Sequence, residues 1–200
     1  MEKFSSKLIE FFVSNDLIKN EDKEIYKYAV NIILSSLIHI ATVMIIGLCF
    51  NLFIESLVFY FSFIAIRKFA GGYHAKTPVR CYLFSFASNI IILCLVKWLS
   101  SINTLFIFIF IIFIIFELLC VVLILLISPL DTENNPLTGQ EKKMYRMLTS
   151  IITILIFIIS SLCFFKGYRN IGSSMICGVV MSALVLLMRK IQIINMRIKK

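Results

Sequence analysis

Residues 103–127 read NTLFIFIFIIFIIFELLCVVLILLI, and this stretch decides the fold class. Within these 25 residues the only ionisable side chain apart from Cys120 is Glu117. A helix needs about 20 consecutive apolar residues to cross about 30 Å of hydrocarbon, so the stretch predicts a transmembrane helix. Because 60 % of the whole chain is hydrophobic, composition excludes an ordinary water-soluble domain.

Outward from this stretch, five further apolar runs have suitable length for spans. They are residues 28–48, 50–67, 81–98, 147–165 and 171–188. The first two are joined by a very short connection near Asn51, so they form a hairpin. We therefore predict an all-α integral membrane protein with about six transmembrane helices. These helices occupy residues 28–188 of a single polytopic domain covering residues 1–200.

The N-terminal segment, residues 1–24, precedes these spans and has a different pattern. Phe4, Leu8, Phe11 and Phe12 form one apolar stripe of a helix whose remaining positions are largely polar. The stripe predicts an amphipathic helix on the membrane surface, and docking on a partner protein is the alternative. Charges are mixed through the segment, so we expect it to be retained rather than cleaved as a signal peptide.

Lysine and arginine are distributed unevenly between the two sides of the predicted bundle. With the N-terminus inside, 17 of the 20 fall on one side, and the other side holds only Lys97, Lys166 and Arg169. Cytoplasmic loops carry the excess of positive charge, so both termini, including a basic tail at 189–200, are predicted to be cytoplasmic. The net charge of +9 then reflects orientation and contact with membrane lipids, and we expect no nucleic-acid partner.

A polar segment, RKFAGGYHAKTPVRC, runs from Arg67 to Cys81 between the second and third spans. Gly71 and Gly72 end the second span and permit a tight turn with close backbone approach. A threonine followed by Pro78 is typical of a helix start, with proline at the first helical position. The third span is therefore expected to begin at Pro78, with Cys81 in its first turn.

His74 and Cys81 could carry covalent chemistry in this segment. A helix N-terminus and the adjacent Arg80 favour a thiolate at Cys81, and His74 can serve as base and acid in acyl transfer. Asn31, near the start of the first span, is the candidate to orient the imidazole. The alternative is that the glycines make a turn, the basic residues mark the inner face, and His74 and Cys81 are incidental.

The second polar segment, SPLDTENNPLTGQEKKMYR, occupies residues 128–146 and predicts a cytoplasmic loop. It is a connector or, through Lys142 and Lys143, a contact for a charged substrate. The six cysteines contain no CxxC pair, so we expect neither a metal site nor a cofactor.

Three ionisable residues lie inside the predicted spans, namely His39, Glu55 and Glu117. Charged groups are costly there, so such residues either pack as polar contacts or serve transport. We favour packing. A small non-enzymatic transporter or export partner for a peptide or lipid is the alternative function, and it would depend on these three residues rather than on Cys81.

The polar segment between spans resembles the accessory gene regulator protein B (AgrB) family of membrane cysteine endopeptidases. The residues that carry the resemblance are Arg67, Lys68, Gly71, Gly72, His74, Ala75 and Cys81. It extends over nearly the whole chain, through the amphipathic start, the number of spans and the second loop.

The resemblance implies an enzyme of the Gram-positive cell membrane, with a catalytic His74 and Cys81 at the cytoplasmic face. Its substrate would be a short AgrD-type propeptide. The acidic C-terminal tail is cut off, and the remainder passes through an acyl-enzyme thioester to a cyclic thiolactone or lactone quorum-sensing signal. Lys142 and Lys143 offer charge to the acidic tail, and Arg67 would bind substrate or act as an interfacial anchor. A homodimer is also suggested.

Overall fold

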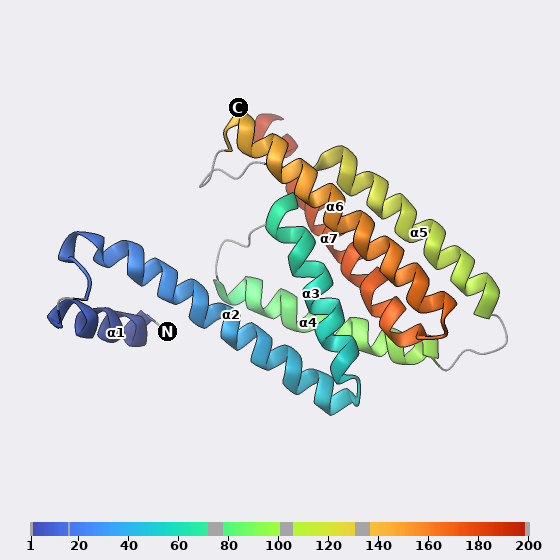
Figure 1. Cartoon of the computed structure of the whole chain (residues 1–200), viewed down its shortest axis with the longest axis horizontal. Coiled ribbons are helices and arrows are strands. Elements are labelled where there is room, and N and C mark those ends of the chain that lie inside the picture. The colour runs from blue at the N-terminus through green and yellow to red at the C-terminus, as the bar shows by residue number, and fades with distance from the viewer. Residues whose placement is uncertain (1, 16, 72–77, 101–105, 131–136, 199–200) are drawn as a thin grey trace. The chain divides into compact units, whose positions relative to one another are not determined.

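The computed structural model describes residues 2–15, 17–71, 78–100, 106–130 and 137–198, and every regular element in these ranges is helical. The helices are α1 (Glu2–Ser14), α2 (Lys23–Phe50), α3 (Phe53–Ala70), α4 (Pro78–Ser100), α5 (Phe106–Ile127), α6 (Gly139–Phe165) and α7 (Arg169–Ile198), with a 3₁₀ turn at Asn20–Asp22 (Figure 1). The all-α prediction is confirmed.

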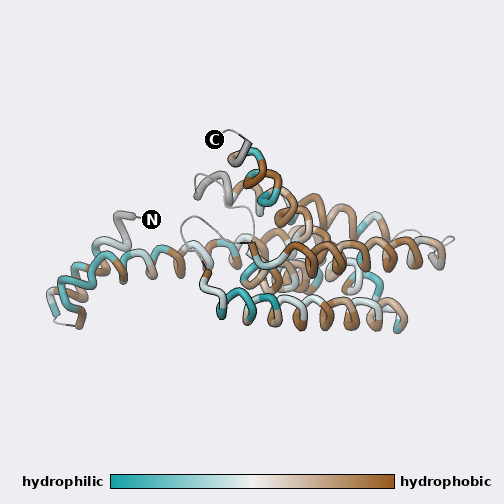
Figure 2. Tube along the Cα trace, turned by 90° about the horizontal axis from the view of Figure 1, so that it is seen from above, coloured by the Kyte–Doolittle hydropathy of each residue, from teal (hydrophilic) through white to brown (hydrophobic). Residues whose placement is uncertain are grey.

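The six predicted spans correspond one by one to α2 through α7. Within the described ranges, α2, α4, α6 and α7 have both the length and the apolar composition needed to cross a membrane. Helix α5 is 22 residues long and carries Glu117 as its one charged residue, whereas α3 carries Glu55, Arg67 and Lys68 within 18 residues. Hydrophobic residues cover most of the length of these helices (Figure 2). The chain is therefore an all-α membrane protein.

The chain divides into two compact units. Unit 1 covers Met1–Ile45 and contains α1, the 3₁₀ turn and most of α2, and unit 2 covers Ile46–Lys200. In unit 1, α1 confirms the predicted N-terminal helix, whereas its place on a membrane surface stays a prediction. That the whole chain forms one polytopic domain also stays a prediction.

Helix α7 is the centre of unit 2, where it packs against α3, α4, α5 and α6. In its apolar segment 67 % of the residues are buried, compared with 22 % in the segments of α4 and α6. Small residues allow this close packing, as is usual between membrane helices. A Cβ added to Gly178 would lie 2.7 Å from Ser62 Cβ and 3.1 Å from the Phe63 nitrogen of α3.

The hydroxyl of Ser182, one turn after Gly178, lies 3.3 Å from the Phe63 carbonyl oxygen and within hydrogen-bond distance of the Gly178 carbonyl. These contacts fix how α7 is placed along α3. Helix α7 then continues to Ile198, ten residues beyond the predicted end of the last span at residue 188.

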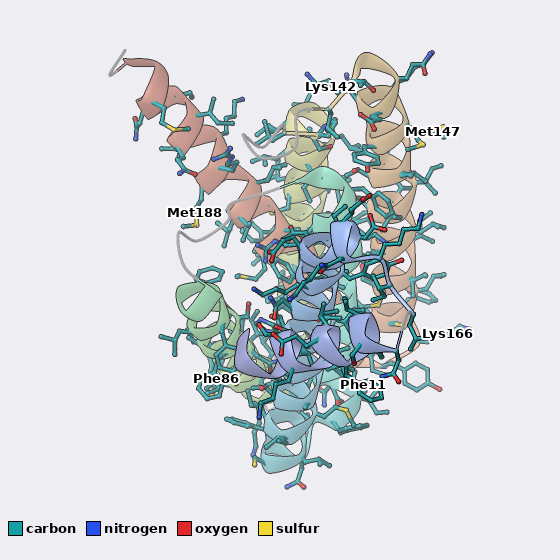
Figure 3. The ribbon with its side chains drawn as sticks, turned by 90° about the vertical axis from the view of Figure 1, so that its left-hand side faces the viewer. Phe11, Phe86, Lys142, Met147, Lys166 and Met188 are labelled. Atoms are coloured by element: carbon teal, nitrogen blue, oxygen red, sulfur yellow. The ribbon has the colours of Figure 1, made fainter. Side chains whose placement is uncertain are left out.

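One end of unit 2 is formed by the end of α3, the end of α5, the start of α6 and the last third of α7 (Figure 1). We call it the basic end, because its cations are Arg67, Lys68, Lys142, Lys143, Arg146, Arg189 and Lys190. Figure 3 shows Lys142 and Lys166 toward opposite ends of α6. That the basic end faces the cytoplasm stays a prediction.

Candidate functional site

The turn after α3 requires a glycine at position 71. Gly71 has a φ of +78°, and its N–H donates to the Arg67 carbonyl at 3.2 Å. A Cβ at this position would lie 2.6 Å from the Leu130 carbonyl oxygen, which is backbone and cannot easily move. The predicted role of Gly71 in a tight turn is confirmed. Gly72 and His74 lie outside the described residues.

Helix α4 begins at Pro78, as the sequence predicts. Arg80 and Cys81 are its third and fourth residues, so the backbone places both in the first helical turn. The first N–H groups of a helix have no partner within it, and the positive end of the helix dipole favours an anion there. The backbone position of Cys81 is therefore suited to a thiolate.

Arg67 lies in the last turn of α3, and its guanidinium carbon is 5.5 Å from the centre of the Phe63 ring on the same helix. The ammonium of Lys68 is 5.5 Å from the ring of Phe69. Cations at this end of a helix interact favourably with its dipole, and a ring face stabilises them further. This arrangement fits an anchoring role for Arg67, and substrate or oxyanion binding by Arg67 stays a prediction.

The turn after α3 is joined to the second loop and to α6. The N–H of Leu130 donates to the Ala70 carbonyl at 3.1 Å. The rings of Phe69 and Tyr145 meet edge to face, with centroids 5.9 Å apart. The two predicted loops therefore begin beside each other, at the contact between the end of α3, residues 128–130 and the start of α6.

A capping box starts α6. The backbone N–H of Thr138 donates to Glu141 at 2.8 Å, its hydroxyl lies 2.9 Å from the same carboxylate oxygen, and the Glu141 N–H donates back to that hydroxyl at 3.4 Å. The Thr138 N–H, and secondarily its hydroxyl, holds the pKa of the exposed Glu141 below its usual value. This cap presents Lys142 and Lys143 on the surface.

Lys142 and Lys143 place two positive charges near the N-terminus of α6, which is the positive end of the helix dipole. The first turns of a helix favour acidic side chains, so cations at Lys142 and Lys143 gain nothing from the dipole of α6. Both are exposed. A contact of Lys142 and Lys143 with a charged substrate stays a prediction.

Asn31 lies in α2 within unit 1, and its Oδ1 atom is buried with no hydrogen-bond partner among the residues that the structure describes. The predicted pairing of Asn31 with His74 is not tested by this observation and stays a prediction.

Glu117 is fully buried in α5 and meets Ser160 of α6. The Ser160 hydroxyl oxygen lies 2.8 and 2.9 Å from the two carboxyl oxygens and 2.9 Å from the Phe157 carbonyl. The Ser160 hydroxyl is the donor in this group and the carboxyl oxygens of Glu117 are acceptors, so the contact joins α5 to α6. The contact agrees with the packing interpretation. His39 and Glu55 are half-buried.

Two buried polar groups at the basic end were not identified by sequence reasoning. Arg189 is 9 % exposed and Ser128 is 5 % exposed, and neither Arg189 Nε nor Ser128 Oγ has a hydrogen-bond partner in the described part of the chain. From the sequence, Arg189 is only the first residue of the predicted basic tail at 189–200. A signal existed, because Ser182, Leu186 and Arg189 recur at i, i+4 and i+7, which places Arg189 on the buried face of α7.

Within the described ranges, no three His, Cys, Asp or Glu side chains cluster in a way that could hold a metal ion.

Comparison with known proteins places this arrangement in a family. The family model described as Accessory gene regulator B matches residues 5–188. An AgrB-like protein of Clostridium perfringens strain SM101 is 36 % identical over 184 residues, which cover 90 % of this chain and 85 % of that protein. A second AgrB-like protein, from strain 13, is 35 % identical over 159 residues, covering 76 % and 73 %.

A more distant relative is the accessory gene regulator protein B of Staphylococcus aureus strain MRSA252, which is 31 % identical over 110 residues, or 55 % of each chain. No solved structure matches the chain.

Proposed function

Because this chain belongs to the accessory gene regulator B family, we propose that it is a membrane cysteine endopeptidase that cleaves and cyclises a quorum-sensing propeptide. Membership associates the chain with an accessory gene regulator system. The observation that carries the finer proposal is the start of α4 at Pro78, which sets Cys81 in the first helical turn directly after the segment that contains His74.

In the first step, the Cys81 thiolate attacks the carbonyl carbon of the scissile amide. The imidazolium of His74 gives its proton to the leaving nitrogen, the C–N bond breaks, and the acidic tail departs as a free amine. The remainder of the propeptide is left as a thioester on Cys81.

In the second step, a cysteine or serine within the retained propeptide attacks the thioester carbonyl. His74 accepts the proton from that thiol or hydroxyl, and the Cys81 thiolate leaves and is regenerated. The ring closes as a thiolactone or lactone. Converting an amide to a thioester is uphill, so water must be kept from the acyl-enzyme, and a site at the edge of an apolar bundle suits that requirement.

The proposed partner is an AgrD-type propeptide lying on the inner leaflet of a Gram-positive cell membrane. The excess of cations at the basic end supports a cytoplasmic location for the catalytic pair. A homodimer is proposed from the family resemblance alone.

The test is co-expression with a propeptide of this type, followed by mass spectrometry of the peptide and of the protein. Wild type should release the tail and carry a transient acyl adduct, whereas Cys81→Ala and His74→Ala should release none. Cys94→Ala is the matched control, because Cys94 is an exposed cysteine of the same helix. Tail release by the Cys81→Ala protein would contradict the proposal.

The charge of Lys142 and Lys143 offers a second test. Reversing both to glutamate should slow cleavage of the acidic propeptide, and the loss should shrink as salt is raised, since exposed charges are screened. Lys166→Glu at the other end of α6 is the control. Unchanged cleavage after the double reversal would remove the steering role.

The transport alternative depends on His39, Glu55 and Glu117. Since Glu117 is engaged by Ser160 in the interior of unit 2, it fits a packing contact better than a moving charge. This contact favours the cleavage function over transport.

A further inference from the structure

Arg189 is a buried cation that lacks a full set of partners. Its Nη1 donates to Gln192 Oε1 at 3.0 Å, and its Nε is buried and unbonded within the described residues. A guanidinium has five N–H donors in a rigid fork, and the edge formed by Nε and Nη2 matches the two oxygens of a carboxylate. Nη1 is bonded to Gln192, so Nε is the donor that the described residues leave unbonded, and a carboxylate on that edge would satisfy it.

The packing of α7 on α3 places Arg189 at the end of α3. Both helices run in the same direction (Figure 1), and the Ser182 hydroxyl contacts the Phe63 carbonyl. Seven residues further along each helix, roughly 10 Å at 1.5 Å per residue, lie Arg189 and Ala70. Leu186, one turn before Arg189, belongs to the same buried cluster as Ala70, which supports this register.

A second unpartnered donor comes from α5. Ser128 follows the last residue of α5, and its hydroxyl is buried without a partner in the described ranges. Leu130, two residues later, is hydrogen-bonded to Ala70. Arg189 and Ser128 therefore both lie toward the end of α3. The chain continues from there, after Gly71, into the segment that contains His74.

The direction of Arg189 indicates what kind of ligand it takes. The neighbouring Met188 is 45 % exposed and projects away from α7 (Figure 3), and Ile191 is 56 % exposed. These two residues lie on the outer face of α7, whereas Arg189 at 9 % exposure faces the packed interior. A lipid headgroup would approach from the exposed side, so a peptide carboxylate inserted from the basic end is the better fit.

We propose that Arg189, with Ser128 as a second donor, binds one acidic side chain of the propeptide and so positions the scissile bond beside the segment bearing His74 and Cys81. This proposal rests on the proposed function. It differs from attraction by Lys142 and Lys143, because a buried bidentate contact selects one carboxylate and is little affected by salt.

A binding measurement on catalytically inactive protein tests this proposal separately from cleavage. Cys81→Ala protein in phosphatidylcholine nanodiscs would be titrated with a labelled synthetic peptide that carries the sequence of the propeptide's acidic tail. Arg189→Lys keeps the charge but loses the fork, so binding should weaken about tenfold, and Ser128→Ala should weaken it less. The loss should persist in high salt.

Substitutions in the peptide can identify the carboxylate that Arg189 binds. Replacing each Asp or Glu in turn by Asn or Gln should identify one position at which the wild-type and Arg189→Lys proteins bind alike. Lys190→Met is the protein control, since Lys190 is exposed on the same helix, and it should change binding less than about twofold. Because the peptide substitutions leave the protein unaltered, misfolding of an Arg189 variant would not obscure the result.

The proposal is overturned if no acidic position responds to Arg189, or if Arg189→Lys and Lys190→Met have equal effects. Arg189-dependent retention of added phosphatidylglycerol, with peptide binding unchanged, would assign the site to lipid phosphate and also overturn it. Cleavage by protein with Cys81 intact is measured in parallel. Cleavage with no response to Arg189 refutes this site alone, and Arg189-dependent binding without cleavage refutes the proposed function alone.

Discussion

Glu117 and Arg189 are both buried in unit 2, but their hydrogen-bond partners differ. Glu117 lies in the interior between α5 and α6, where Ser160 meets both of its carboxyl oxygens. Arg189 lies at the basic end of α7, with one nitrogen bonded to Gln192 and Nε unbonded within the described residues. A buried ionisable group is costly unless it is paired or hydrogen-bonded. The difference indicates that Glu117 serves packing and that Arg189 serves a ligand.

The largest expected effect comes from breaking the packing of α7 on α3, which buries the face of α7 that carries Arg189. Gly178→Leu would place side-chain atoms against Ser62 and the α3 backbone, which cannot shift easily. We expect a destabilisation of about 3 kcal/mol or more, seen as loss of a monodisperse peak in detergent size-exclusion chromatography. Gly139→Leu is the control, because nothing lies within 4 Å of a Cβ there. A well-folded Gly178→Leu protein would refute the packing described for α7.

The Glu117 side of the comparison comes next in magnitude. Glu117→Ala should lower the free energy of unfolding by about 2 kcal/mol, because it leaves a cavity and removes the hydrogen bond to Ser160. Glu117→Gln keeps a donor and an acceptor and should cost less than about 1 kcal/mol. Unfolding titrations in mixed micelles measure both. Equal losses for the two variants would mean that the carboxyl acts through its charge.

Removing the charge of Arg189 should not lower stability, in contrast to removing the carboxyl of Glu117. Arg189→Met replaces an incompletely paired buried cation by an apolar side chain of similar length, so stability should be unchanged or raised by about 1 kcal/mol. Propeptide binding should nevertheless be lost. If the same titration instead finds a loss as large as that of Glu117→Ala, then Arg189 has a structural partner and the contrast between the two residues disappears.

The smallest effect concerns a carboxylate that is satisfied at the surface. Because Thr138 lowers the pKa of Glu141, the capping box stabilises the fold above the pKa of an unfolded glutamate, about 4.3, and this contribution is lost as pH falls through the lower folded value. The melting temperatures of wild type and Glu141→Gln should therefore differ at pH 7, and the difference should shrink as pH falls through the lowered pKa of Glu141. A constant difference across this range would contradict the charged cap.

The sequence predicted the helices well because each is encoded locally. Apolar length sets α2 and α4 to α7, and Pro78 sets the start of α4. It also predicted that Gly71 makes a turn. It did not predict Leu130 as the backbone partner that makes a side chain at position 71 impossible, since that contact joins residues about 60 positions apart.

Arg189 was missed for a physical reason of the same kind. A cation just after an apolar run is usually an interfacial anchor, and the positive-inside rule uses it only as a mark of sidedness. Its burial depends on the contacts of Ser182 and Gly178 with α3, and Ser182 and Phe63 are separated by 119 residues. Local periodicity places Arg189 on a face of α7, but only tertiary packing determines what covers that face.

The hydrogen bond between Leu130 and Ala70 has a consequence for how this chain tolerates changes in length. Residues 128–130 are held against the turn after α3, so they cannot absorb an insertion without separating the two loops. An epitope tag or a fluorescent reporter therefore belongs after Leu130 and before the cap at Thr138. Placed only a few residues earlier, the same tag would pull Ser128 away from the end of α3.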